Sequence, residues 1–236
     1  MMLARALFLL LALTSVAQEA APAPSAGEIL AMVRQSYAAQ NQRLKGSLRD
    51  SHSGRREDLQ LTLDSKGMVL EFAPPMAEKL ILELRGNQAL LWEEREGKRQ
   101  EVAPELSAQP LRGMPLNRED ISLRFTHWNR TDVLDANAKL GAAGVACWLV
   151  RCVAPDRRGP YGTVDLWVEK QSGGIAKMQA HDVEGRLVKR FQVTKLQRIG
   201  ELSMLREMRI EAVDPASGKT SGRCYLTLEA PPKAEP

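Results

Sequence analysis

Apolar and polar residues alternate with a period of two through most of the chain beyond residue 44, and this pattern limits the fold more than any other feature. Leu59, Leu61 and Leu63, for example, alternate with Gln60 and Thr62. Successive side chains of a strand point to opposite faces, so each such segment predicts a strand with one dry face and one wet face. The apolar positions that we expect on the dry face are Leu61, Leu63, Leu70, Phe72, Leu82, Leu84, Leu90, Trp92, Val164, Leu166, Val168, Met208 and Ile210.

Short turn signals separate these segments. Glycine-containing turns at 65–67, 85–87, 96–98, 172–174, 184–186 and 217–219 follow the alternating runs at close spacing. Such short connections join antiparallel neighbours, because parallel strands need a longer crossover. We therefore predict a mainly β protein, with about ten or eleven strands in one large, curled antiparallel sheet.

Two segments instead show the spacing of helices. Ser25 and Glu28 form a capping box, and the apolar residues that follow predict a helix over about 26–42. Asn117 can cap a second, short helix, in which a narrow apolar stripe consists of Ile121, Phe125 and Trp128. This helical material either fills the concave side of the sheet as an ordinary core, or forms a lid over a space left for a ligand.

The chemistry of the dry face fits an acyl chain. Its residues are mostly Leu, Val, Ile and Met, with few aromatic and no recurrent charged side chains. An acyl chain offers only burial and dispersion contacts, worth about 0.8 kcal/mol for each buried CH₂ group. The same aliphatic residues would also build a filled core, so composition leaves both alternatives open.

The first residues indicate export. Residues 1–17 combine a positive start, a short apolar run and small residues before a cleavage point, as in a secretory signal peptide. The apolar run is shorter than the roughly 20 residues that a membrane-spanning helix needs. We therefore expect a signal peptide at 1–17, a flexible linker at 18–27, one binding domain at 28–230 and a disordered tail at 231–236.

Charge and motifs argue against several functions. The net charge of +4 is spread along the chain without a basic patch, so we expect no nucleic-acid partner. The three histidines lack metal-ligand spacing, and no phosphate-binding loop or nucleophile elbow is present. We therefore predict no enzyme activity, no metal and no cofactor, although a triad converging from distant strands remains compatible with the sequence.

Three cysteines leave two alternatives. Cys147 and Cys152 share one predicted strand and lie five residues apart, so they point to opposite faces and do not bond to each other. Cys224 could form a disulfide with Cys147 or with Cys152 in an oxidising compartment. Alternatively, all three thiols are buried and free.

Five short motifs resemble those of the bacterial outer-membrane lipoprotein-sorting proteins, in the LolA-like, largely uncharacterised branch. They lie at 119–125 (EDISLRF), 147–148 (CW), 161–169 (YGTVDLWVE), 182–189 (DVEGRLVK) and 208–210 (MRI), and the segment 84–92 is similar to a LolA strand-turn-strand that ends in Leu-Trp. The resemblance covers roughly residues 28–230. It implies a half-open antiparallel β-barrel with a helical lid, whose cavity carries lipoprotein acyl chains across the periplasm.

One departure from that family affects the mechanism. LolA has a Lys-Arg-Pro turn whose arginine helps to hold the lid closed, whereas the corresponding turn here is Asp64-Ser65-Lys66-Gly67. No residue of this chain is therefore assigned that role.

We predict a monomeric periplasmic carrier or chaperone for the acyl chains of lipids or lipoproteins. Its expected partners are inner- and outer-membrane proteins that handle lipoproteins. The alternatives are a module that senses lipids or mislocalised lipoproteins and signals to a protein partner, and a secreted hydrolase.

Overall fold

The computed structural model describes residues 23–38, 41–74, 77–86 and 88–230. The predicted signal peptide at 1–17, part of the predicted linker and the predicted tail at 231–236 lie outside the described residues. Helix α1 spans Ala26–Ala38, so its start agrees with the capping box, while its end comes before the predicted residue 42 because Gln42 already begins the first strand.

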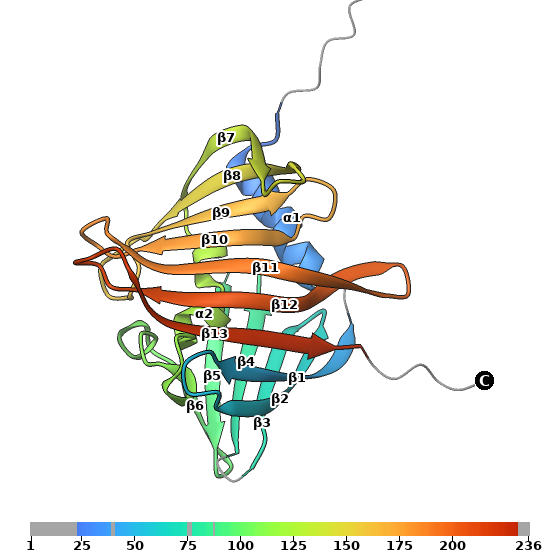
Figure 1. Cartoon of the computed structure of the whole chain (residues 1–236), viewed down its shortest axis with the longest axis vertical. Helices are drawn as coiled ribbons and strands as arrows, with labels where there is room; N and C mark the ends of the chain where they lie inside the picture. Colours follow the sequence, from blue (N-terminus) through green and yellow to red (C-terminus); the bar gives the residue numbers. More distant parts are fainter. Residues whose placement is uncertain (1–22, 39–40, 75–76, 87, 231–236) are drawn as a thin grey trace, which may run out of the picture.

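The strands form one antiparallel sheet of two meanders (Figure 1). The strand order is β6-β5-β4-β3-β2-β1-β13-β12-β11-β10-β9-β8-β7, so the pairing of β1 with β13 joins the two halves. The strands of the N-terminal half are β1 (Gln42–Asp50), β2 (Arg56–Asp64), β3 (Gly67–Phe72), β4 (Glu78–Arg85), β5 (Gln88–Arg95) and β6 (Lys98–Glu101). Those of the C-terminal half are β7 (Arg130–Leu140), β8 (Val145–Val153), β9 (Thr163–Glu169), β10 (Ile175–His181), β11 (Leu187–Ile199), β12 (Leu202–Val213) and β13 (Thr220–Glu229).

The mainly β, antiparallel architecture is as predicted, but the sheet contains 13 strands rather than ten or eleven. The two edge strands explain most of the difference. All four residues of β6 are exposed, and β7 is exposed along most of its length, so neither strand shows a clear alternation of apolar residues.

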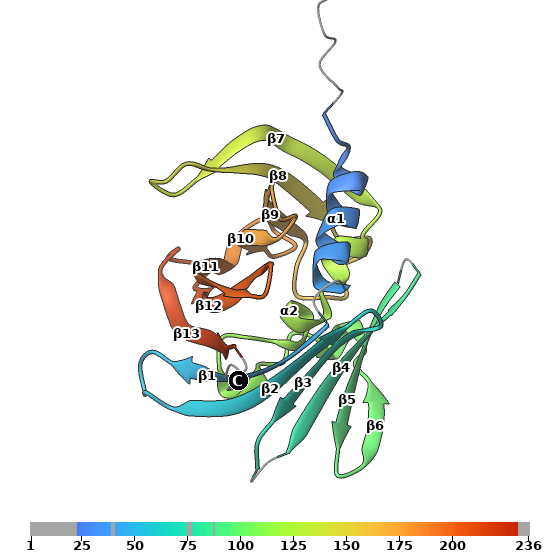
Figure 2. The same ribbon diagram turned by 90° about the vertical axis from the view of Figure 1, so that its right-hand side faces the viewer.

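The segment between the two edge strands crosses the concave side of the sheet (Figure 2). It contains the 3-10 turns η1 (Pro104–Leu106), η2 (Leu111–Gly113) and η3 (Arg124–His127), and the short helix α2 (Arg118–Ser122). The sheet curls around both α1 and α2. The predicted second helix is therefore shorter than expected, because Leu123 adopts a left-handed conformation (φ 49°) and ends α2.

The dry face predicted from alternation is the concave face. Leu61 pairs with Leu70, and Leu70 with Leu80, so buried leucines of β2, β3 and β4 lie side by side. Directly paired residues share one face of an antiparallel sheet. The same rule continues across β9 to β12, where Leu166 pairs with Met178 and Phe191 with Ile210.

Two of the predicted dry-face residues lie on the other face. Leu90 pairs with Glu83 and Trp92 with Ile81, whereas Leu91 pairs with Leu82 on the concave side. This part of the prediction is wrong because residues 89–92 are all apolar, so alternation alone does not set their phase. The register with β4 sets it, and Leu91 is 1% exposed.

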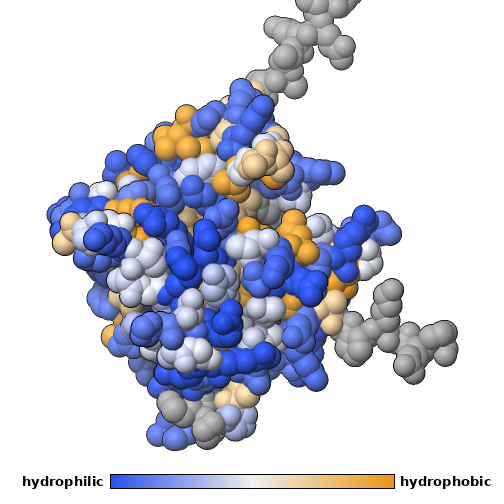
Figure 3. All heavy atoms as spheres, in the orientation of Figure 1, coloured by the Kyte–Doolittle hydropathy of each residue, from blue (hydrophilic) through white to orange (hydrophobic). Residues whose placement is uncertain are grey.

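The outer surface is largely hydrophilic on the face that Figure 3 shows. Exposed leucines lie towards the outer end of the long β11–β12 hairpin, where Leu196 is 62% exposed and Leu202 is 38% exposed, on opposite faces of the hairpin. No helix within the described ranges is long and apolar enough to cross a membrane.

Candidate functional site

A buried polar network holds helix α2 against the C-terminal half of the sheet, on its concave side. The carboxylate of Asp120 accepts hydrogen bonds from the Tyr161 hydroxyl (2.6 Å) and from the Lys189 ammonium on β11 (2.6 Å). The Asn117 side chain donates to the Tyr161 hydroxyl (3.1 Å). All four residues are at most 7% exposed. A buried charge is tolerated when it is paired and hydrogen-bonded, as Asp120 is here.

The same short helix is fixed locally by a capping box. The Asn117 side chain accepts from the backbone N–H of Asp120, and the Asp120 side chain accepts from the backbone N–H of Asn117. Asp120 therefore satisfies the helix N-terminus and the ammonium of Lys189 at once. The predicted cap at Asn117 is confirmed.

On its other flank, α2 is tied to the N-terminal half of the sheet. The Arg118 guanidinium donates to Glu93 on β5 (2.9 and 3.0 Å) and to Glu78 on β4 (3.2 Å). Burial opposes ionisation of Glu93, but its contacts with Arg118 outweigh this effect and lower the pKa of that carboxyl. Helix α2 thus bridges the two halves of the sheet through ion pairs on both sides.

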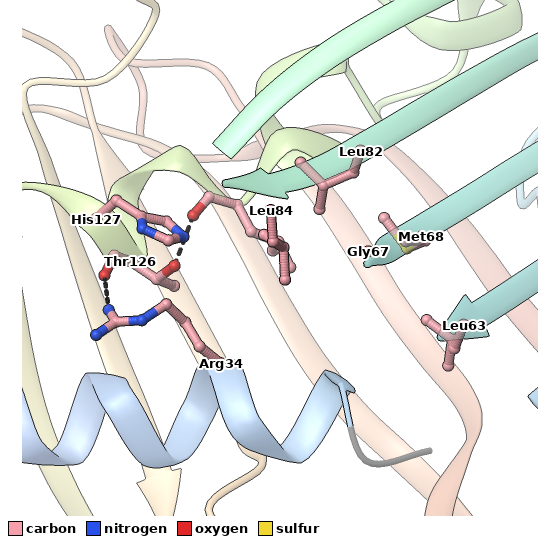
Figure 4. Close-up of a pocket in the computed structure, with 9 residues that line it drawn as sticks. Arg34, Leu63, Gly67, Met68, Leu82, Leu84, Thr126 and His127 are labelled. Atoms are coloured by element: carbon pink, nitrogen blue, oxygen red, sulfur yellow. Dashed lines mark hydrogen bonds between the residues drawn. The ribbon is translucent and has the colours of Figure 1, made fainter. Parts of the chain in front are cut away.

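An apolar cavity lies beside this bridge, under α1 and η3 (Figure 4). Its wall is formed by the ends of β2, β3 and β4, and its cover by Leu123, Thr126 and His127 of the η3 segment. The cavity volume is about 20 Å³, close to the room for a single water molecule. Pockets that bind small molecules usually measure about 300–1,000 Å³. In this conformation, side chains therefore nearly fill the cavity.

The predicted dry-face residues divide into three groups. Leu63, Leu82 and Leu84 line this cavity. Leu61, Leu70, Phe72, Val164, Leu166, Val168 and Ile210 are buried in the core, and Met208 packs against it. Leu90 and Trp92 lie on the opposite face, as described above. Whether any of these residues contacts a ligand stays a prediction.

The predicted lid residues pack inward together. Phe125 is fully buried, Ile121 is 8% exposed, and Trp128 is partly buried against the core. The rings of Phe125 and Trp128 meet edge to face, with centroids 6.4 Å apart. This contact anchors η3 to the core.

A cationic side chain lies at the rim of the cavity, whose exposed lining is almost entirely apolar. Arg34 reaches from α1 to η3, where its guanidinium donates a hydrogen bond to the carbonyl oxygen of Thr126. Figure 4 shows Arg34, Thr126 and His127 at this rim, and the leucines of the strands on the opposite side. Burial lowers the pKa of the Arg34 guanidinium. The amino-acid sequence does not single out Arg34, because a single arginine on an amphipathic helix is normally solvated.

The three cysteine thiols are buried and free in the structure, as in the second of the two alternatives that the sequence left open. Cys147, Cys152 and Cys224 are all buried and unbonded, so the disulfides considered from Cys224 to Cys147 or Cys152 are absent. Burial raises the pKa of Cys152 and Cys224 to about 12. Thiols with such pKa values stay protonated at neutral pH and are poor nucleophiles.

A second, larger hollow of about 400 Å³ lies on the surface between the β5–β6 hairpin and the segment 102–118. Its basic side chains, Arg95, Lys98 and Arg118, are balanced by three glutamates, and Arg118 is already paired with Glu93. This hollow is open and has no excess charge, so it selects no ligand class. In the part of the chain that the structure describes, no group of His, Cys, Asp and Glu side chains could hold a metal ion.

The family model that matches residues 68–224 carries the description "-like: Uncharacterized protein". This chain belongs to that family. Among proteins with curated functions, none matches the chain. The resemblance to an uncharacterised LolA-like branch is confirmed by the solved structures that share the fold.

Three of those structures show the likeness. A domain assigned to the outer membrane lipoprotein-sorting proteins, from Vibrio parahaemolyticus, superimposes with a TM-score of 0.66 at 15% identity, covering 89% of this chain and 93% of that chain. A DUF1329 family protein from Desulfovibrio piger gives 0.65 at 14% identity, with coverage of 89% and 93%. A LolA superfamily protein from Nitrosomonas europaea gives 0.62 at 17% identity, with coverage of 88% and 92%. At these identities the likeness establishes the fold.

Proposed function

We propose that this protein is a periplasmic, non-enzymatic carrier that binds the acyl chains of lipids or lipoproteins under α1 and η3. The observation that carries the proposal is the apolar cavity on the concave face of a LolA-like sheet, lined by Leu63, Leu82 and Leu84. Such a surface binds an aliphatic chain by burial, at about 0.8 kcal/mol for each CH₂ group. The lining contains no carboxylate and no cysteine, which fits binding rather than catalysis.

Binding requires the cavity to widen. An acyl chain is far larger than 20 Å³, so side chains of the lining must move when it enters. Met68, Leu84 and Leu123 lie at the cavity and are only partly buried, so they are the side chains freest to reorient. Methionine in particular adapts to irregular surfaces.

A pair of leucine variants tests the proposal. Leu84 on β4 lines the cavity, whereas Leu90 on β5 is also partly buried but lies on the opposite face. We expect Leu84→Asp to weaken binding of a fluorescent fatty acid by about tenfold or more, because a carboxylate next to an acyl chain must be desolvated. Leu90→Asp is the matched control, with unchanged affinity.

Native mass spectrometry of the mature protein, purified from its own periplasm, provides the second measurement. A bound lipid or lipoprotein would support the carrier and identify its cargo. A ligand-free mass, together with no uptake of the fluorescent fatty acid by the wild type, would refute the proposal. Leu166→Asp is a poor substitute for the Leu84 variant, because Leu166 is fully buried away from the cavity and its replacement would unfold the protein.

The exposed leucines of the β11–β12 hairpin favour a second candidate function, a sensing module that signals to a protein partner. Leu196 is 62% exposed and lies opposite the partly buried Leu205 on one face of the hairpin, so this apolar pair is available for contact with a partner. A photoreactive residue at position 196 should then crosslink to one periplasmic protein in a manner that depends on bound lipid. A crosslinking pattern that ignores lipid would contradict this candidate.

A further inference from the structure

We propose that the cavity selects amphiphiles with an aliphatic tail and an anionic head group, and that Arg34 is the residue that binds this group. The inference deepens the proposed carrier function and rests on it. It concerns the shared chemistry of carboxylates and phosphates, namely negatively charged oxygen acceptors at the end of an aliphatic tail.

The first argument is the position of the Arg34 guanidinium at the rim of an apolar cavity. Its inner wall is apolar and consists of Leu63, Met68, Leu82 and Leu84, all contributed by the ends of neighbouring strands. Arg34 lies at the opposite end, next to the η3 segment (Figure 4). A molecule that contacts both has an aliphatic tail inside the cavity and one charged or strongly polar end at its rim. A neutral hydrocarbon would leave the guanidinium unused.

The second argument is the missing counter-ion. Across the described ranges, other half-buried or buried arginines near the helices have carboxylate partners: Arg118 pairs with Glu93, and Arg124 with Glu119. Among the described residues, no carboxylate forms an ion pair with Arg34, and its hydrogen-bond acceptor is the neutral carbonyl oxygen of Thr126. A partly desolvated cation without a counter-ion favours an anion that brings one.

The third argument is donor capacity. A guanidinium has five N–H donors in a planar fork that matches the oxygens of a carboxylate or phosphate. The Thr126 carbonyl takes a bond from one guanidinium nitrogen, Nη1. The remaining donors can bind a head group while this contact persists, so that α1 and η3 stay joined when the ligand is bound. Burial also lowers the pKa of Arg34, as expected for a cation that its surroundings compensate only in part.

Four probes with the same twelve-carbon tail test the inference on the mature protein. They are laurate, dodecyl phosphate, uncharged dodecanol and cationic dodecyltrimethylammonium, each kept below its micelle concentration and measured by displacement of a fluorescent reporter. We expect both anions to bind about tenfold or more tightly than the cation, as charge-assisted hydrogen bonds predict. The anion that binds more tightly shows whether the natural head group is a carboxylate or a phosphate.

Three variants assign the effect to its residue. Arg34→Gln should weaken the two anions about tenfold and change dodecanol by less than about twofold. Arg34→Lys should retain the preference for anions over the cation, because it retains the charge. Arg43→Gln, at an exposed position on β1, is the control and should leave all four affinities unchanged.

The outcomes separate the two proposals. Binding of dodecanol together with equal affinities for laurate and the cation would overturn the role of Arg34 and leave the carrier function standing. Unchanged anion selectivity in a folded Arg34→Gln variant would overturn it as well. Failure of the wild type to bind any of the four probes would refute the carrier function itself.

Discussion

Replacement of Asp120 by Asn should destabilise the protein strongly, because Asp120 is the counter-ion of a buried lysine. Asp120 is 7% exposed and accepts from the Tyr161 hydroxyl and the Lys189 ammonium at 2.6 Å each. An asparagine has one oxygen and one NH₂ group in place of the two oxygens. In either orientation of the amide, its NH₂ group faces the Tyr161 hydroxyl or the Lys189 ammonium, both of which are donors. Lys189 also remains a buried cation without a counter-ion.

The expected magnitude follows from that geometry. Removing one partner of a buried ion pair costs about 3–5 kcal/mol. This loss is a large part of the roughly 5–15 kcal/mol that stabilises an ordinary domain. For a domain of this size, it corresponds to a fall in the melting temperature of roughly 6–20 °C. Cation–π contacts of Lys189 with the Tyr161 and Phe191 rings, 5.8 and 5.9 Å away, should keep the loss near the lower end.

Urea unfolding of single and double variants measures the pair directly. Asp120→Asn combined with Lys189→Met removes both charges, so the double variant should recover about 2 kcal/mol or more relative to Asp120→Asn alone. Glu207→Gln breaks the exposed Lys195–Glu207 pair (3.1 Å) and serves as the control, with an expected loss below about 1 kcal/mol. A loss below about 1 kcal/mol for Asp120→Asn, or no recovery in the double variant, would refute the view that α2 is fixed by this ion pair.

Three further predictions concern stability. Burial raises the pKa of the Cys152 and Cys224 thiols from 9.0 to about 12. Because the thiols of the unfolded chain ionise first, the contribution of these two thiols to the free energy of unfolding is complete below pH 9. Between pH 9 and pH 12 it falls by about 1.4 kcal/mol for each thiol and each pH unit. Urea midpoints at pH 8 and pH 10 should show this loss, and Cys152→Ala should reduce it; an identical pH dependence in that variant would contradict the assignment. Gly67→Ala should destabilise the protein by more than about 2 kcal/mol, because Gly67 has a φ of 148° and an added Cβ would lie 1.9 Å from the carbonyl oxygen of Leu82; a melting temperature equal to that of the wild type would show that β4 can shift. Ser25→Ala should cost about 1 kcal/mol through loss of the α1 cap, measured as a lower thermal midpoint, and no change would mean that the cap contributes little to the folded domain.

The fold could be predicted from the sequence wherever one side of a strand is clearly apolar. Leu59, Leu61 and Leu63 of β2 alternate with polar residues, and this phase survives in the structure because a slip by one residue would expose all three. In β5 the apolar residues 89–92 are consecutive, so the local sequence does not decide whether residues 89 and 91 or residues 90 and 92 face the concave side. Pairing of Leu91 with Leu82 decides between them, and that is a long-range contact.

The candidate site was less accessible to sequence reasoning for a related reason. Asp120 and Lys189 are 69 residues apart, and Arg118 is 25 residues from Glu93 and 40 from Glu78. The motif around 119–125 indicated the segment through its family resemblance, but it did not indicate that its charges face inward. A charged residue in a short helix is normally solvated, and only the crossing of this segment over the concave face buries these side chains.

The different attachments of α1, α2 and the cavity wall limit how the cavity can widen. Moving α2 would break buried ion pairs with both halves of the sheet, at about 3–5 kcal/mol for each. Removing α1 would expose Ile29, Leu30 and Val33, which are at most 2% exposed, at about 1.5–3 kcal/mol for each. Rotating the partly buried side chains that line the cavity requires neither. Opening at the least cost therefore keeps both helices in place and reshapes the space between Arg34 and the strand ends.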